Sequence, residues 1–450
     1  MCLVTPGHSP DGVIAWLHQT TLDDIPDEVV AFGQRCLLDL IGVAAAGRTT
    51  ELSSIIHDHA AAHFGAGTVG APMLFDGRIA SPAGAALAGG MTIDSIDAHD
   101  GNKFTKGHTG CHQLPALLAM SHALDRTSAG EFLADLIVGY EVATRAGIAL
   151  HETAPDYHTS GAWGAVGVAA LGARLMGLNE QQTFEAMGIA EYHGPRSQMM
   201  RVIDHPTMLK DGSGWGAMAG VSAVYLAADG FTGAPAVTVN DPAVASLWAD
   251  LGERWIIFEQ YFKLYPVCRW AQPAVEAVLS LRTEHDLTAA DIDTIQIATF
   301  HEAARLATAT PSTTEHAQYS LPFPVAAALV RGQLGAAEVS AAALADPEIR
   351  SLAKRVSIVE DDHHNAAFPG NRYARATVTL ANGQSLQSAD HEPRGDPEAH
   401  LSDDEIRAKF HRFADPVLGS DRASAIEEAV DNLSNSGTTD QLSSLLYPAI

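Results

Sequence analysis

The sequence predicts a mainly α-helical protein that carries a smaller, inserted α+β domain. Three observations lead to this fold class: helical apolar periodicity over most of the first 260 residues, strand-like alternation after about residue 263, and a return of the helical pattern near residue 402. Both chain ends would then build one large helical body, from residues 1–262 and 398–450, while residues 263–397 form an α+β lid. A length of 450 residues agrees with two such units.

The helices of the first 260 residues are identified by their periodicity and their end signals. Residues 26–46 place apolar side chains on one helical face, and Gly47 closes the segment. Residues 128–150 and 179–191 repeat this pattern, with N-cap signatures in SAGEF and NEQQ. In residues 159–177, glycine and alanine recur every three or four positions, which predicts a buried helix that its neighbours approach closely.

The segment after residue 263 contains the strands. Residues 292–300 alternate apolar and polar positions, as a half-buried strand does, and residues 373–389 read as a hairpin that turns at an Asn-Gly pair. Residues 322–332 and 336–344 between these strands are expected to be helical. This order indicates an α+β unit rather than a parallel βαβ series.

The helical pattern returns near the end of the chain. Ser402 and Glu405 form a capping-box signature ahead of IRAKF, and residues 424–434 are amphipathic. We therefore expect the C-terminal segment to rejoin the helical body.

Composition and charge limit the class of function. Acidic residues number 54 against 27 basic ones, and the net charge of −27 argues against nucleic acid or an anionic membrane as partner. No signal peptide or membrane-spanning run is evident, so a cytoplasmic protein is expected. The four cysteines show neither disulfide-framework nor metal-site spacing. They are Cys2, Cys36, Cys111 and Cys268.

Residues 94–115, DSIDAHDGNKFTKGHTGCHQLP, concentrate groups that exchange protons near neutral pH. Glycines interrupt the segment, and an apolar helix is expected to begin near Leu114-Pro115, so the polar side chains would line a pocket at a helix N-terminus that favours anions. We predict one wall of an anion-binding site rather than a solvated loop. Its titratable residues are Asp94, Asp97, His99, Asp100, Lys103, Lys106, His108 and His112.

Three further places combine chemistry-bearing side chains with small residues or a domain boundary. His158 precedes the glycine-rich helix and would act as a general acid or base, or else cap that helix. Lys210, in HPTMLKDGSGWG, would hold a carboxylate or donate a proton, or else lie exposed at a helix end. Lys263 and Arg269 lie where the helical body changes to the α+β domain, and an interdomain cleft there would suit a di- or tricarboxylate.

A metal centre in the Asp/His segment is the main alternative to an anion site. Its acids and histidines are suitable ligands, but no HExxH or comparable helix-spaced pair is present, and the neighbouring lysines would repel a cation. The sequence also lacks a GxSxG elbow, a P-loop and a GxGxxG that follows a strand. Serine hydrolases and nucleotide-binding enzymes are therefore not indicated.

In their order and spacing these motifs resemble the MmgE/PrpD family, which includes 2-methylcitrate dehydratase, cis-aconitate decarboxylase and iminodisuccinate epimerase. The resemblance runs from about residue 25 to about residue 415. The segments that carry it are LLDLIGVAAAG, GGMTIDSIDAHDG, KGHTG, LPALLA, YHTSGAWGAVGVAAL, TMLKDGSGWGAMAG, KLYPVCRWAQPAVEA, YSLPFPVAAALVRG, PRGDP and DDEIRAKF.

The resemblance implies a homodimer whose helical body carries most of the site, with the α+β domain as a lid. It also implies catalysis with no organic cofactor and no metal. Carried over by position, the family's active-site acid falls on Asp97, its next histidine on His108, and its histidine before the glycine-rich helix on His158. The family's two lysines fall on Lys210 and Lys263.

This sequence differs from the family pattern at several of those segments. His99 stands where the family's DxDD segment has an acid, and Gly101 stands where the decarboxylase has a threonine. Cys268 replaces a histidine after the Tyr-Pro pair, and Phe323 replaces a tyrosine. These differences argue against decarboxylation of cis-aconitate and against a direct transfer of the methylcitrate substrate.

The resemblance and the residues together predict a lyase that dehydrates a small hydroxy di- or tricarboxylate by removing a proton next to a carboxylate. His158 is the expected base, Lys210 would hold a carboxylate, and Asp97 and His108 would position or exchange protons. The alternatives are an epimerase or isomerase of a small dicarboxylate, a cis-aconitate-type decarboxylase, and a silent carboxylate-binding protein. The residues expected to bind substrate are His99, Lys103, Lys106, Lys263, Cys268, Arg269 and Phe323.

Overall fold

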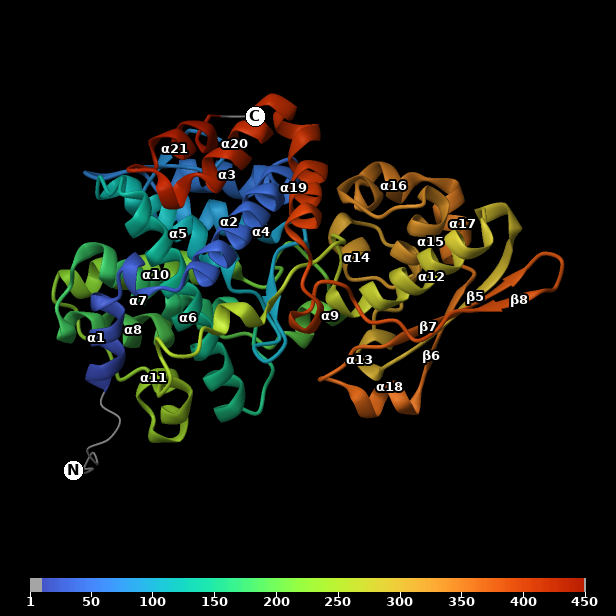
Figure 1. Cartoon of the computed structure of the whole chain (residues 1–450), viewed down its shortest axis with the longest axis horizontal. Helices are drawn as coiled ribbons and strands as arrows, with labels where there is room; N and C mark the ends of the chain where they lie inside the picture. The colour runs from blue at the N-terminus through green and yellow to red at the C-terminus, as the bar shows by residue number, and fades with distance from the viewer. Residues whose placement is uncertain (1–9, 449–450) are drawn as a thin grey trace.

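Packed helices make up the first half of the chain, and the central ones are almost entirely buried (Figure 1). The structure, a computed structural model, describes residues 10–448. Two short ribbons, β1 (Ala71–Pro72) with β2 (Ile79–Ala80) and β3 (Gly101–Asn102) with β4 (Gln260–Tyr261), interrupt the helices. The helices are α1 (Pro10–Gln19), α2 (Asp27–Gly47), α3 (Glu51–His63), α4 (Pro82–Asp94), α5 (Gly110–Ala123), α6 (Ala129–Thr153), α7 (Gly161–Met176), α8 (Glu180–His193), α9 (Met200–Asp204), α10 (Ser213–Ala228) and α11 (Val237–Asn240).

Helix α2 is the one described helix that is long and apolar enough to cross a membrane by length and composition. Of its apolar window, 83% is buried inside the protein. It contacts α4, α5, α6 and α19 (Asp403–Leu418). It therefore serves as a core helix of this fold.

Helices α7 and α10 pack closely through glycine, as the spacing in residues 159–177 predicts. A Cβ placed on Gly216 would lie 2.6 Å from the carbonyl oxygen of Gly161, closer than real Cβ contacts allow. Helix α7 ends at Gly177, whose positive φ of 61° forms a left-handed cap. The close approach brings the first turns of the two helices together, beside the segment that precedes each of them.

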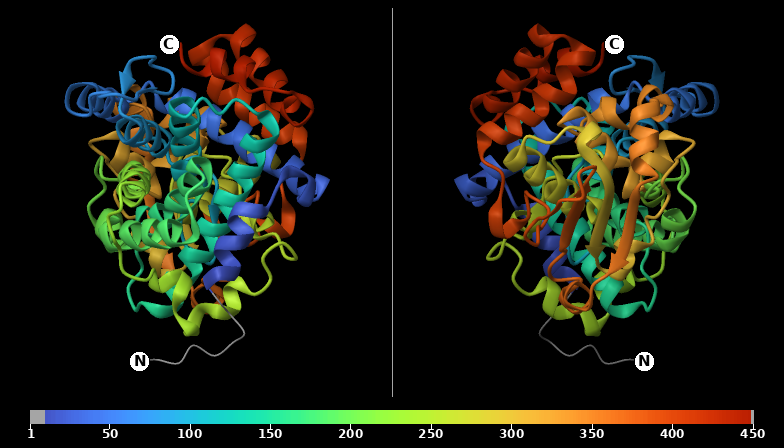
Figure 2. Two further views of the ribbon diagram at one scale, coloured as in Figure 1. Left: turned by 90° about the vertical axis from the view of Figure 1, so that its left-hand side faces the viewer. Right: turned by 90° about the vertical axis from the view of Figure 1, so that its right-hand side faces the viewer.

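The lid contains a four-stranded sheet in the order β6-β5-β7-β8, which Figure 2 shows facing the viewer in its right-hand view. Strands β5 and β6 are parallel and the other pairs are antiparallel, so the unit is α+β as predicted. Helix α12 contacts β7, and α15 contacts β6. The strands are β5 (Ile292–Thr299), β6 (Val356–Glu360), β7 (Ala374–Leu380) and β8 (Ser385–Gln387). The helices are α12 (Gln272–His285), α13 (His301–Ala304), α14 (Thr314–Gln318), α15 (Pro322–Arg331), α16 (Ala341–Ala345), α17 (Pro347–Ala353) and α18 (Asp362–Ala367).

After the lid, the chain returns to the helical body. The predicted capping box is present: the Ser402 hydroxyl accepts from the Glu405 backbone N–H, and the Glu405 carboxylate accepts from the Ser402 N–H. Helix α19 packs along α2, followed by α20 (Ser420–Asp431) and α21 (Asp440–Leu446), beside the N-terminal helices in Figure 1. Both ends of the chain thus build the body, while the boundaries at 262/263 and 397/398 stay a prediction.

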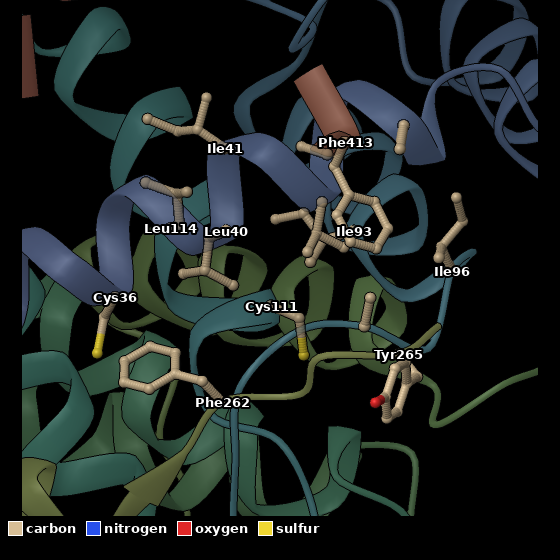
Figure 3. Packing of buried hydrophobic residues seen from close by; sticks show 14 of the residues in the cluster. Cys36, Leu40, Ile41, Ile93, Ile96, Cys111, Leu114, Phe262, Tyr265 and Phe413 are labelled. Carbon is tan, nitrogen blue, oxygen red and sulfur yellow. The ribbon is translucent and has the colours of Figure 1, made fainter. Parts of the chain in front are cut away.

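The hydrophobic core lies directly beneath the Asp/His segment. Figure 3 shows Leu40 of α2, Ile93 of α4, Leu114 of α5 and Phe413 of α19 meeting in one cluster. This packing fixes the ends of α4 and α5, and residues 95–109 connect them.

Two local expectations differ from the structure. Helix α5 begins at Gly110 rather than near Leu114, because the Asp100 carboxylate accepts the Gly110 N–H at 3.3 Å and stabilises the first turn. Residues 336–344 divide into a short 3₁₀ turn (Ala336–Val339) and α16, since Ser340 caps a new helix there.

Candidate active site

The Asp/His segment is held from beneath by buried polar contacts. The Tyr140 hydroxyl of α6 donates to the Asp100 carboxylate, and the Lys409 ammonium of α19 donates to the Ala98 carbonyl at 2.7 Å. On its other side, β3 pairs with β4, so the segment is tied to the chain just before Lys263. The polar loop predicted from the sequence is therefore held rigidly and forms one wall of the site.

His108 presents an unprotonated ring nitrogen to the site. Its Nδ1 contacts the Asp100 carbonyl oxygen, which only accepts hydrogen bonds, so Nδ1 carries the hydrogen and Nε2 has a free lone pair. Burial, with the nearby charges of Lys263 and His99, lowers the pKa of His108 well below its usual value. At neutral pH this imidazole is therefore a neutral proton acceptor.

Asp97 and Lys263 form a buried ion pair beside that nitrogen. The Lys263 ammonium donates to the Asp97 carboxylate, and His108 Nε2 lies 3.8 Å from the same carboxylate oxygen. Burial alone would raise the pKa of Asp97, but the charge of Lys263 outweighs it and holds that pKa below its usual range. Asp97 in turn raises the pKa of Lys263 against the effect of burial, so both groups stay charged.

A second buried carboxylate, Asp211, faces His108 from the loop before α10. Its Oδ2 lies 3.6 Å from His108 Nε2 and accepts the Ser160 hydroxyl at 2.7 Å. Ser160 also accepts the His108 backbone N–H at 3.0 Å. Burial and the charge of Asp94 raise the pKa of Asp211 to about 7, so it exchanges a proton near neutrality.

Lys210 lies behind this wall rather than on it. Its ammonium donates to the Gln318 side-chain oxygen at 2.6 Å and rests 5.0 Å from the centre of the Tyr319 ring. The same Gln318 oxygen accepts the Asp97 backbone N–H at 2.9 Å. Lys210 therefore connects α14 of the lid to the Asp/His segment, and its backbone adopts a positive φ of 49° to do so.

Asp97, His108 and Lys263 border a pocket, partly open to solvent, between the helical body and the lid. One side is apolar and aromatic, with Met199 and Ile203 of the body facing Trp270 and Phe368. The other side carries acids, a base and cations. Its lining residues are Asp97, Lys106, His108, Tyr157, Met199, Ile203, Tyr261, Lys263, Cys268, Arg269, Trp270, Tyr319, Phe368 and Arg372.

The structure gathers many of the predicted site residues at this pocket. Those that line it are Asp97, His108, Lys106, Lys263, Cys268 and Arg269. His99 lies in the layer behind, its ring edge to face with His108 at 4.3 Å between centres and its Nε2 3.4 Å from Asp94. Burial raises the pKa of the Cys268 thiol to about 12, so it lines the pocket as a neutral group.

Lys210 and His99 lie behind the pocket lining, and three further predicted residues also lie outside it. The Lys103 ammonium is bound by Asp396 and Glu398, at 3.2 and 2.8 Å. Phe323 is fully buried in α15, within the hydrophobic core. His158 is half-buried, with Nδ1 2.7 Å from the Asp156 carbonyl oxygen. Its neighbour Tyr157 reaches the pocket instead.

Eight pocket residues were missed from the sequence: Tyr157, Met199, Ile203, Tyr261, Trp270, Tyr319, Phe368 and Arg372. Tyr319 brings a hydroxyl to the pocket from the segment where the sequence comparison chose Phe323. Burial raises the pKa of Tyr319 well above its usual value, so it keeps its proton. A tyrosine four residues before Phe323 was a visible signal, whereas the loop around Arg372 shows no periodicity that marks a site.

The Asp/His segment does not form a ligand set for a metal ion. Across residues 10–448, no three His, Cys, Asp or Glu side chains converge in a way that would hold one. The acids of the segment are directed to separate partners: Asp94 to backbone N–H groups, Asp97 to Lys263, and Asp100 to Tyr140.

Both halves of the chain match known domain families. Residues 13–246 match the MmgE/PrpD N-terminal domain, and residues 265–435 match the MmgE/PrpD C-terminal domain. The chain belongs to the MmgE/PrpD family. The C-terminal match spans the lid and continues through α19 and α20 of this MmgE/PrpD protein.

Curated relatives resemble this MmgE/PrpD protein over nearly its whole length. The cis-aconitate decarboxylase-like protein oryM of Aspergillus oryzae is 24% identical over 96% of this chain and 95% of its own. Cis-aconitate decarboxylase of Homo sapiens is 24% identical over 96% and 92% of the two chains. That of Aspergillus terreus is 24% identical over 92% and 91%. The relatives are lyases, and this identity level leaves the substrate open.

Proposed function

We propose that this protein is a cofactor-independent lyase that dehydrates a small hydroxy di- or tricarboxylate. The observation that carries the proposal is the free Nε2 of His108, which lies on the pocket wall beside the Lys263 ammonium. A neutral base next to a fixed cation suits removal of a proton from a carbon that bears a carboxylate, because the cation stabilises the negative charge that develops on that carboxylate.

In the proposed reaction, His108 takes the proton from the carbon next to the carboxylate. The C–H electron pair forms a carbon–carbon double bond while the neighbouring C–O bond breaks. The His108 imidazolium then gives the same proton to the departing hydroxyl, so water leaves and the imidazole is neutral again. Asp97 and Asp211, at 3.8 and 3.6 Å from Nε2, would stabilise the transient imidazolium.

This assignment moves the base from His158 to His108 and gives Lys210 a positioning role. The contacts of Lys210 with Gln318 and Tyr319 support that role, since they hold the lid residues that face the pocket. The participation of His158 stays a prediction from the sequence resemblance.

Decarboxylation is a second candidate, favoured by the cis-aconitate decarboxylases among the relatives. The same pocket would hold an unsaturated tricarboxylate, and a carbon–carbon bond would break with release of CO₂ while a proton is delivered to carbon. Tyr319 supports this candidate because it lines the pocket and its side chain carries a hydroxyl that can donate a proton.

The test is proton NMR of the purified protein in deuterated buffer with a panel of hydroxy di- and tricarboxylates and with cis-aconitate. A new vinyl signal from a hydroxy acid, at equal rate with and without EDTA, is the expected result. Deuterium entering the α-carbon without an alkene would instead establish an epimerase, and CO₂ release from cis-aconitate a decarboxylase. Loss of activity in EDTA would overturn the cofactor-independent mechanism.

A further inference from the structure

Arg372 places an unpaired, buried positive charge on the wall of the pocket. It lies between α18 and β7 of the lid, is 3% exposed, and lines the pocket. Its Nε and Nη1 atoms are buried without a hydrogen-bond partner. Within residues 10–448, its guanidinium forms no ion pair.

The other cations of the pocket are already balanced. Lys263 is paired with Asp97, and the Arg269 guanidinium binds Asp396 and the Gln272 side-chain oxygen. Lys106 is half-exposed, so water can solvate its ammonium. Among the pocket cations of the part of the chain that the structure describes, Arg372 is therefore the one that is buried and forms no direct ion pair, although the charge of Asp396, which binds Arg269, lies near it.

The Arg372 guanidinium lies over the Tyr261 ring. The central carbon of Arg372 lies 5.7 Å from the ring centre, and that of Arg269 lies 4.5 Å from the same centre. An arginine that packs on a ring directs its N–H groups along its own plane, where a carboxylate can accept two hydrogen bonds. The Nε and Nη1 atoms of Arg372, which have no hydrogen-bond partner, are therefore two donors available to an anion.

We propose that Arg372 binds a second carboxylate of the substrate, remote from the carbon that loses its proton. A buried unpaired charge disfavours the empty protein, and an incoming carboxylate supplies the missing partner. Because His108 belongs to the body and Arg372 to the lid, a ligand with two carboxylates would join the two units, and Arg372 would select polycarboxylates over monocarboxylates. This inference rests on the proposed function, which places a carboxylate substrate in the pocket.

The test is calorimetric binding of tricarballylate, a tricarboxylate with no hydroxyl to eliminate, and of butyrate, which carries a single carboxylate. Arg372→Met is compared with wild type and with Arg375→Gln, which removes a lid arginine paired with Asp361 and Asp390 outside the pocket. We expect Arg372→Met to weaken tricarballylate binding by at least about 30-fold and to leave butyrate binding within a few-fold of wild type, while Arg375→Gln binds both ligands as wild type.

Thermal unfolding of the same variants separates binding from folding. If Arg372 awaits a ligand, Arg372→Met unfolds at the same or a higher temperature than wild type without ligand, and tricarballylate stabilises it less than it stabilises wild type. Wild-type affinity in Arg372→Met would overturn the inference and leave the proposed function intact. Binding that depends on Arg372 in a protein that turns over no acid would overturn the proposed function alone, and absence of binding to wild type would overturn both.

Discussion

His108 and His158 occupy similar places in the sequence, since each precedes an Ala/Gly-rich helix, but the fold treats them differently. His108 is buried and its Nδ1 is fixed by the Asp100 carbonyl, which leaves Nε2 on the pocket wall. His158 is half-buried and bonded to the carbonyl of Asp156, two residues before it. Burial and tautomer, rather than residue type, favour His108 as the base.

This difference predicts opposite effects of two matched substitutions. His108→Asn should lower kcat by about 10²- to 10⁴-fold with KM changed by a few-fold, as expected when a general base is lost, whereas His158→Asn should keep kcat within about tenfold. Because the pKa of His108 is lowered, wild-type kcat/KM should stay level from pH 8 to below pH 6.5 and fall only in more acidic buffer, where Nε2 is protonated. Steady-state kinetics with the acid identified by NMR measure both. If His158→Asn lowered kcat more than His108→Asn does, His158 rather than His108 would be the base.

Asp211 predicts a pH dependence of stability. Burial and Asp94 raise its pKa to about 7, so the folded protein retains a proton that the unfolded chain releases above its ordinary value near 3.8. This contribution to the free energy of unfolding is full below pH 3.8 and decreases as the pH rises toward 7.

Asp211→Asn, which mimics the protonated acid, should therefore gain stability relative to wild type by roughly 2 to 3 kcal/mol between pH 5 and pH 8. Urea unfolding at both pH values measures the change, and Asp293→Asn, at an exposed position of β5, serves as the control. If the free energies of unfolding of Asp211→Asn and wild type differed by the same amount at pH 5 and pH 8, the pKa of Asp211 would not be raised.

At the scale of secondary-structure elements, the periodic parts of the sequence predict the fold well. Helices α2, α6 and α8 begin and end within a few residues of their predicted limits, and α19 begins at its predicted cap, because caps and apolar spacing are local signals. Strand β6 was not predicted, since it has a mixed burial pattern and pairs with β5 far away in sequence. A pairing between strands that are distant in the sequence leaves no pattern in the residues near either strand.

Helix α19 shows how the end of the chain supports the site. Lys409 is 2% exposed, and its ammonium donates both to Asp39 of α2 and to the Ala98 carbonyl of the Asp/His segment. Burial lowers the pKa of Lys409 and raises that of Asp39, so neither group is well solvated and each depends on the other.

We expect Lys409→Met to reduce the free energy of unfolding by about 3 to 5 kcal/mol, because it leaves Asp39 buried without a partner. The double substitution Asp39→Asn with Lys409→Met should recover part of that loss. Urea unfolding measures each variant, and Lys354→Met, at an exposed position, should behave as wild type. A double variant as unstable as Lys409→Met would mean that the Ala98 contact, not the ion pair, carries the stability.

At the scale of the whole molecule, the pocket could be predicted only in part. The Asp/His segment and the two cations near residue 263 were visible because they concentrate charge in a short stretch of an acidic chain. Gln318, Tyr319 and Arg372 were not, because each reaches the body through lid folding over long sequence separations. His108 was found as a site residue, but its role required the tautomer and burial that only the fold supplies.

The body also leaves an apolar face that a homodimer, as the family resemblance implies, would cover. Trp215 and Leu226, 42% and 39% exposed, are eleven residues apart in α10 and therefore project from one side of that helix. Leu209, just before α10, is 69% exposed. Exposed apolar groups that gather on one helix are typical of a subunit interface.

Light scattering after size exclusion should therefore give about 95 kDa, twice the 47.4 kDa of one chain. Trp215→Glu with Leu226→Glu should shift the mass toward 47.4 kDa, because two carboxylates would be buried without partners at the interface. Val359→Glu, at a 38% exposed apolar position of β6 in the lid, is the matched control and should leave the mass at the dimer value. A wild-type mass of one chain would contradict the dimer, and dissociation by Val359→Glu would place the interface on the lid instead of α10.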